Sequence, residues 1–303
     1  MKKGLVQWLI LLILVLTWGS SFILMKKGLL VFPAVQVGAL RIALTFIFLS
    51  PFMFLRIRKV KRSQWHQLLI CGLVGSGIPA FLFAYAQTGI DSSLSGILNS
   101  LTPLFTLILG ILFFKFRAKW YQVVGVLVGL AGACGLVSIS GAGNMAWNFS
   151  YAIYIIVATI CYAININLIK TWFKETDAIS ITTYSIGAIG IPAIIYLLFF
   201  TDFMVVMQTR DAAWEAFGMV AILAVFGTGI ALMLYNYLIK ISNVVFASSV
   251  TYMIPVVAIL WGVFDGESFN IINVLWILLV LTGVFMVNKP PGKKSAESNK
   301  TTN

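Results

Sequence analysis

Charged side chains are scarce in this chain. Aspartate, glutamate, lysine and arginine together make up only 10% of its 303 residues, whereas a soluble domain carries about 25%. Apolar side chains make up 60%, and the mean hydropathy is +1.00. A soluble protein of this composition could not cover its surface with polar groups. The composition therefore excludes a soluble globular domain and indicates a protein embedded in lipid.

Histidine and cysteine are also rare. His66 is the only histidine, and Cys71, Cys134 and Cys161 lie inside apolar runs without metal-like spacing. Neither an HExxH nor a GxSxG motif occurs. These absences argue against an intramembrane enzyme with a metal or nucleophilic site and against a disulfide framework. We expect no enzymatic activity, no metal and no cofactor.

Long apolar runs are what the chain has instead. Lipid offers no hydrogen-bond partners, so a membrane span must be a helix or part of a closed barrel. The runs are roughly twenty residues long and do not alternate as barrel strands do. The sequence predicts an all-α membrane protein with ten transmembrane helices. They are expected at residues 5–25, 34–55, 67–88, 93–114, 120–140, 149–170, 178–200, 214–238, 244–264 and 270–288. The first run lacks an A-x-A-like cleavage site and is interpreted as an uncleaved span. Residues 291–303 form a polar tail that we expect to be disordered.

The basic residues predict the orientation of these spans. With the N-terminus inside, 17 of the 21 lysines and arginines fall in cytoplasmic segments, as the positive-inside rule requires. Lys26, Lys27 and Arg210 fall outside, and Arg41 falls within the second span. Both termini are therefore expected in the cytoplasm. The same rule explains the net charge of +12 without a nucleic-acid partner.

Matching positions in the two halves of the chain indicate an internal repeat. Pro103 and Pro255 stand 152 residues apart, and so do Tyr85 and Tyr237, and Gly110 and Gly262. Trp18 and Lys26 meet Tyr162 and Lys170 at an offset of 144. A duplicated unit of five spans must sit upside down relative to the first, and inverted repeats are a recurring transporter architecture. We expect a first repeat at residues 1–146 and a second at 147–290.

The sequence resembles the EamA-type family of the drug/metabolite transporter superfamily. The resemblance covers about residues 5–288. Its marks are Trp18-Gly19-Ser20-Ser21-Phe22, Arg41, the two prolines each followed by glycine seven residues later, Gly125, Gly129, Gly132 and Gly283. It implies transport of small metabolites such as amino acids, by export, through a central cavity lined by both halves. The family usually has an acid near the end of the fourth span; this chain has Lys115 there and keeps an acid in the second half as Glu267.

Arg41 is the most informative candidate for the substrate site, because a charge inside a span costs roughly 3 kcal/mol on insertion scales. One interpretation is a cavity-facing cation that attracts a carboxylate. The alternative is a structural pair with a helix C-terminus or a side chain that snorkels outward.

Polar and aromatic residues within the spans complete the expected substrate site. The residues are Trp18, Ser21, Arg41, Tyr85, Asn99, Tyr162, Asn165, Asn236, Thr251 and Tyr252. They suit an amphipathic solute, although hydrogen bonds between helices, worth about 0.6 kcal/mol each, or interfacial anchoring of Trp18 would also account for them. Pro103 and Pro255 are expected hinges, although membrane helices tolerate proline without moving.

The sequence therefore predicts a carrier of small organic metabolites that works by alternating access in the cytoplasmic membrane. Multidrug or toxic-cation efflux is the alternative, but it would normally need a buried acid, and Asp91, Asp265 and Glu267 all lie near span ends. A membrane scaffold would not need polar residues at equivalent inverted positions. The expected partners are a small-molecule substrate and the lipid bilayer. The glycine stripe at Gly125 and Gly129 fits packing within a monomer or, alternatively, a homodimer face.

Overall fold

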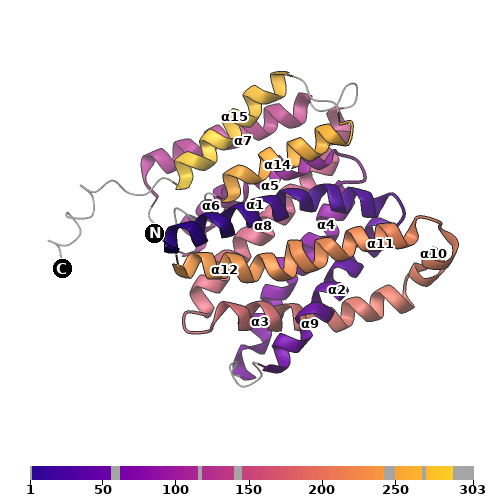
Figure 1. Ribbon diagram of the computed structural model, residues 1–303. Helices are drawn as coiled ribbons and strands as arrows, with labels where there is room; N and C mark the ends of the chain where they lie inside the picture. The colour runs from indigo at the N-terminus through magenta and orange to yellow at the C-terminus, as the bar shows by residue number, and fades with distance from the viewer. Residues whose placement is uncertain are drawn as a thin grey trace.

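The computed structural model describes residues 2–55, 62–114, 118–139, 145–241, 250–267 and 271–288. All regular secondary structure in these residues is helical (Figure 1). Seven helical segments are long and apolar enough to cross a membrane, and three further apolar helices are shorter. The predicted all-α membrane protein is therefore confirmed at this level.

The helices follow the expected apolar runs. The N-terminal ones are α1 (Lys2–Leu29), α2 (Ala34–Leu55), α3 (Trp65–Gly72), α4 (Ile78–Ala86), α5 (Ser92–Asn99), α6 (Thr102–Phe114) and α7 (Trp120–Ile139). The C-terminal ones are α8 (Met145–Trp172), α9 (Ala178–Phe199), α10 (Phe203–Thr209), α11 (Ala213–Ile222), α12 (Ala231–Ile241), α14 (Val250–Phe264) and α15 (Ile271–Asn288). A short 3₁₀ turn, η2 (Arg62–Gln64), precedes α3. The predicted tail at residues 291–303 lies outside the described residues.

Segments far apart in the sequence pack side by side. Helix α7 packs along α15, and α2 along α9. Helix α1 lies against α14 on one side and against α11 and α12 on the other, while α8 lies against α6 and α4. In Figure 1, α7 and α15 form a pair at the edge of the bundle, with α1, α4 and α8 nearer its middle.

Two of the helical segments contain a π-helical stretch. The segment η3 (Leu73–Gly77) joins α3 to α4, and η4 (Leu223–Ile230) joins α11 to α12. A π-helical stretch widens the turn and leaves some backbone groups outside the regular α-helical hydrogen-bond pattern, and such stretches occur frequently at functional sites. These two stretches mark where the bundle departs from regular helix.

The two expected hinge prolines occupy different positions. Pro255 lies inside α14, whereas Pro103 is the second residue of α6, directly after the chain leaves α5 at Asn99. At a helix start the missing proline N–H costs little, because that donor would have no helical partner anyway. The fourth expected span is therefore interrupted beside Asn99, and hinge motion at either proline stays a prediction.

The glycine stripe of α7 faces α15 within the chain. A Cβ atom added at Gly125 would meet Met286 Cβ at 2.7 Å, and one at Gly132 would meet the Val280 backbone nitrogen at 2.7 Å. A Cβ at Gly283 would fall against the backbone of Gly125 and Gly129. The two helices thus approach closely because neither carries a side chain at the contact.

We expect Gly283→Ala to lower the thermal unfolding midpoint in detergent, because the new methyl group meets backbone that cannot rotate away. Overpacking of this kind costs about 1–3 kcal/mol. The matched control is Gly218→Ala in α11, where an added Cβ would have no neighbour within 4 Å. That variant should unfold at the same temperature as the unmodified chain or slightly higher; equal loss in both variants would contradict the role of the close contact.

Candidate functional site

A cavity of about 260 Å³ lies in the middle of the bundle. Its lining comes from α1, α2, η3, α4, α8, α9, η4, α12 and α14, together with Asn99 and Thr102 at the break between α5 and α6. Among the described residues, α7 and α15 contribute none of it. The cavity is close in size to the smaller ligand pockets of proteins.

Aromatic side chains form much of the cavity wall. Trp18 packs against Tyr235 with ring centroids 5.2 Å apart, and Phe83 stacks on Tyr162 at 5.9 Å. The indole Nε1–H of Trp18 donates to the carbonyl oxygen of Gly227 at 3.0 Å. Gly227 belongs to the π-helical stretch η4. Trp18 is therefore anchored to the cavity wall.

Arg41 contributes a positive charge to the cavity. Its Nε–H donates to Thr228 Oγ1 at 3.1 Å, and the Tyr162 hydroxyl interacts with the same guanidinium. Asp265 and Glu267 pair with Lys26 and Lys27, and no ion pair to Arg41 is present in the described part of the chain. Arg41 thus lines the cavity without a counter-ion from the described part of the chain.

Two amide side chains also line the cavity without complete hydrogen bonding. Asn99 Oδ1 and Asn165 Oδ1 are buried, and neither has a partner among the described residues. An unsatisfied buried polar group costs about 1–3 kcal/mol, so such groups are uncommon in folded proteins. Both residues line the cavity, so their amide oxygens are candidate acceptors there in addition to the cation.

At each of the two π-helical stretches, a polar side chain from another helix packs closely against a glycine. A Cβ added at Gly227 would meet Ser21 Oγ at 2.6 Å, and one at Gly75 would meet Asn165 Cγ at 2.7 Å. Ser21 and Asn165 can approach the backbone only because both positions are glycine. Their neighbours Ser76 and Thr228 also line the cavity.

The structure brings most of the predicted site residues together. Trp18, Ser21, Arg41, Asn99, Tyr162 and Asn165 all line the cavity. Tyr85 does not: it is 47% exposed and packs against Tyr154, with ring centroids 4.8 Å apart. The side chains of Asn236, Thr251 and Tyr252 lie outside the described part of the chain.

Sequence reasoning missed the two glycine-flanked hydroxyls. Gly75-Ser76-Gly77 and Gly227-Thr228-Gly229 are separated by 152 residues, the same offset as Pro103 and Pro255. That shared offset was the signal that could have identified them. Their bend into π-helix depends on packing, which no local pattern reveals.

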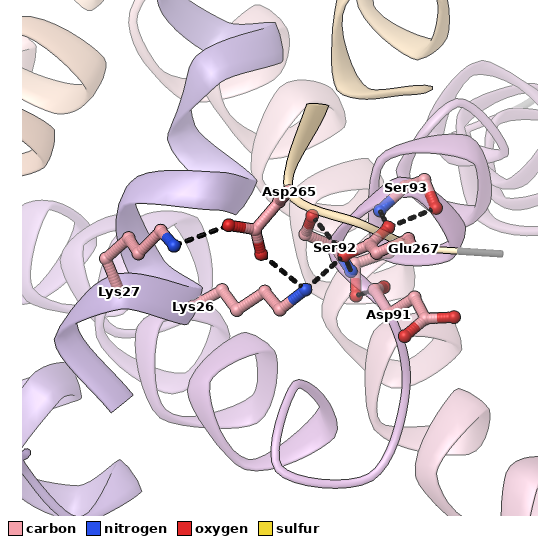
Figure 2. A network of polar contacts seen from close by, with 8 residues as sticks. Lys26, Lys27, Asp91, Ser92, Ser93, Asp265 and Glu267 are labelled. Atoms are coloured by element: carbon pink, nitrogen blue, oxygen red, sulfur yellow. Dashed lines mark hydrogen bonds and ion pairs between the residues drawn. The ribbon is translucent and has the colours of Figure 1, made fainter. Parts of the chain in front are cut away.

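A second polar cluster lies at the Lys26 end of α1 (Figure 2). Lys26 Nζ lies 2.7 Å from Asp265 Oδ2 and 2.8 Å from Glu267 Oε1, and Lys27 also pairs with Asp265. Hydrogen bonds from Lys26 and Lys27 hold the pKa of Asp265 below its usual range. Burial acts to raise the pKa of Glu267, but hydrogen bonds from Lys26 and two serines outweigh it and lower that pKa.

Asp91 shows the opposite behaviour in the same cluster. Burial, together with the nearby negative charge of Glu267, raises the pKa of its carboxyl group. Asp91 therefore carries its charge at a cost that Asp265 and Glu267 avoid by pairing with lysine.

Comparisons with known proteins agree with a transporter. A model of the EamA-like transporter family matches residues 6–138 and again residues 149–289. The chain is 27% identical over 284 residues to the uncharacterized inner membrane transporter YedA of Escherichia coli, covering 90% of this chain and 88% of that protein. It is 21% identical to a probable terminal-alkyne amino-acid exporter of Streptantibioticus cattleyicolor, covering 95% of each chain. A solved crystal structure shares the fold with a TM-score of 0.62 at 16% identity, covering 97% of this chain and 98% of the other.

We expect acid to weaken the Lys26 cluster. Because the folded pKa values of Asp265 and Glu267 lie below their unfolded values of about 4, these groups contribute stability above that pH and lose it as the pH falls through the folded values. The unfolding midpoint in detergent, scanned downward from pH 6, should therefore drop less in Asp265→Asn/Glu267→Gln than in the unmodified chain. Asp91 works in the opposite direction, so Asp91→Asn should steepen the drop; the same acid dependence in all three proteins would contradict this account.

Proposed function

The chain belongs to the EamA-like transporter family, and from this premise we propose that it carries small organic solutes with a carboxylate group across the cytoplasmic membrane. Amino-acid-like metabolites are the proposed substrates, alternating access is the proposed mechanism, and export is the proposed direction. The relative named as an amino-acid exporter supports the substrate class and the direction.

One observation carries the choice of a carboxylate: Arg41 lines the cavity without a carboxylate partner among the described residues. A buried charge is stable only when an opposite charge or several hydrogen bonds compensate it. Thr228 and Tyr162 occupy part of the guanidinium. The remaining donors suit a carboxylate, which arginine binds with two parallel hydrogen bonds.

The amide oxygens suit the other end of an amino acid. Asn99 Oδ1 and Asn165 Oδ1 can each accept a hydrogen bond from an ammonium group. The aromatic surface that Trp18 and Tyr162 add to the same cavity suits an apolar side chain. A zwitterion would therefore satisfy the charge and the acceptors together.

Efflux of toxic cations is the less supported alternative. An exchanger of that kind would need a carboxylate in the cavity to bind the cation and the proton in turn. The described lining of the cavity holds an arginine and no acid. A non-transporting scaffold would gain nothing from a cavity with unpaired polar groups.

We further propose that the chain is a ten-helix bundle of two inverted five-helix repeats, at residues 1–146 and 147–290. The family model matches twice, once in each half. Helix contacts in one half have counterparts in the other. Helix α1 packs against α14 and α12, and the corresponding helix α8 packs against α6 and α4. The contact of Ser21 with Gly227 likewise corresponds to that of Asn165 with Gly75. Two related halves around one cavity suit alternating access, in which one repeat moves against the other.

This architecture predicts that both termini lie in the cytoplasm. A fluorescent protein that folds only in the cytoplasm should be bright when fused to either end of the chain. Fused after Arg210, which the charge distribution places outside, it should be dark. Termini on opposite sides of the membrane would contradict the arrangement of five spans per half.

We expect Arg41→Gln to weaken uptake of carboxylate-bearing solutes into proteoliposomes selectively. Loss of a charge-assisted hydrogen bond costs about 1.5–3 kcal/mol, which corresponds to roughly a 10- to 100-fold loss of apparent affinity. Arg41→Lys should recover only part of the activity, because lysine keeps the charge but not the planar pair of donors.

The matched control is Arg210→Gln, which removes an exposed arginine from the connection between α10 and α11. It should transport like the unmodified chain. Equal transport of an amino acid and of its amide by the unmodified protein, or unchanged amino-acid affinity in Arg41→Gln, would rule out carboxylate recognition by this residue.

A further inference from the structure

The N-terminus of α5 is capped by a residue from another part of the chain. Glu267 accepts hydrogen bonds from the backbone N–H groups of Ser92 at 2.9 Å and Ser93 at 3.1 Å, and from their hydroxyls at 2.7 and 2.6 Å. The first N–H groups of any helix lack partners within the helix. A carboxylate there is favoured by hydrogen bonding and by the helix dipole. Glu267 therefore joins the turn after α14 to the start of α5.

Local structure explains how Glu267 reaches this position. Gly266 has φ +83°, and its N–H bonds to the Val263 oxygen at 3.1 Å while the Glu267 N–H bonds to the Gly262 oxygen at 2.9 Å. These two bonds form a Schellman motif, which ends a helix and turns the chain back across its last turn. Gly262 leaves room for the carboxylate, because an added Cβ there would collide with it.

Asp91 occupies the residue position from which a helix normally caps itself. Its backbone has the extended conformation of an N-cap residue, φ −65° and ψ 154°, yet its side chain makes no capping hydrogen bond. In Figure 2 the Asp91 carboxylate points away from Ser92 and Ser93, while Glu267 lies over them. Two carboxylates are thus near the N-terminus of α5, and Glu267, which is distant in the sequence, is the one that caps it.

The cluster begins one residue along α1 from the cavity lining. Lys26 binds Asp265 and Glu267, and the preceding residue, Met25, lines the cavity. The side chain of Glu267 is only 4% exposed. Separation of the turn after α14 from α1 and α5 would break the ion pairs and leave the α5 N–H groups without partners, unless another acceptor replaced Glu267.

We propose that Asp91 and Glu267 alternate as caps of α5 and thereby form a gate at the Lys26 end of the cavity. When this end is closed, Glu267 caps α5 from across the gate. When the turn after α14 moves away, Asp91 rotates onto the same N–H groups. The exchange lowers the cost of opening, because the helix terminus stays capped in both states.

The test measures the distance across the gate by pulsed electron paramagnetic resonance. Spin labels are placed at Thr88→Cys, in the turn before α5, and at Phe264→Cys, at the end of α14; both positions are exposed. The background replaces the three native cysteines with alanine. Glu267→Gln should increase the long-distance population at least threefold, because it weakens the closed state.

The decisive variants change Asp91 in the Glu267→Gln background. Asp91→Ala should reduce the ratio of long to short distances about fivefold, the factor expected for the loss of one helix cap. Asp91→Asn should keep the long-distance population, because asparagine caps a helix as well as aspartate does. Asp202→Ala is the matched control: Asp202 begins α10 without a capping hydrogen bond of its own, and its removal should leave the distances unchanged.

Three results would overturn the proposal. These are no increase with Glu267→Gln, no effect of Asp91→Ala, or equal effects of Asp91→Ala and Asp91→Asn, which would show that charge rather than capping matters. The measurement needs no solute, so its outcome is independent of whether the proposed substrate class is right.

Discussion

The absence of hydrogen-bond partners in lipid is the constraint on which this structure depends. It requires helical spans, because only a helix satisfies its backbone groups within one segment. It also makes every unpaired polar group inside the bundle costly. Arg41, Asn99 and Asn165 are such groups and line one cavity, whereas other buried unpaired atoms, such as Gln36 Oε1, belong to residues that are not part of its lining. The arginine and the two amides within one cavity therefore mark it as the candidate site.

The same constraint explains why backbone irregularity and polar side chains occur together. The stretches η3 and η4 and the break before Pro103 all border the cavity. Non-regular backbone at membrane depth is tolerated where protein or water can satisfy it. Trp18 uses one such group, the Gly227 carbonyl, as its acceptor. Irregular backbone here supplies both shape and hydrogen-bonding groups to the cavity.

The helical membrane fold and the family could be predicted from the sequence, because the lengths of the apolar runs and the ordered set of family residues can be read from one chain. The sequence also identified Arg41 and the two amides of the cavity lining, since a charge or amide inside a span is costly and so stands out. Tyr85 was misleading because a tyrosine pair at a repeat offset does not tell which face of the helix it occupies. The capping of the α5 N-terminus by Glu267 could not be predicted, because it depends on how α14 and α5 pack together. The resemblance pointed to this acid without saying what it binds.

Corresponding positions of the two proposed repeats carry different charges, and this difference bears on the proposed direction of transport. Lys26 and Lys170 correspond, but the position that corresponds to Glu267 in the first half holds Lys115. Two lysines repel where a lysine and a glutamate attract, so the sequence offers no counterpart of the Lys26–Glu267 ion pair at these positions of the first half. With the N-terminus inside, as the basic residues predict, the Lys26 end of the cavity is expected to face outward. Without a solute, the carrier should then favour the state closed outside and accessible from the cytoplasm, which is the state in which an exporter takes up its substrate.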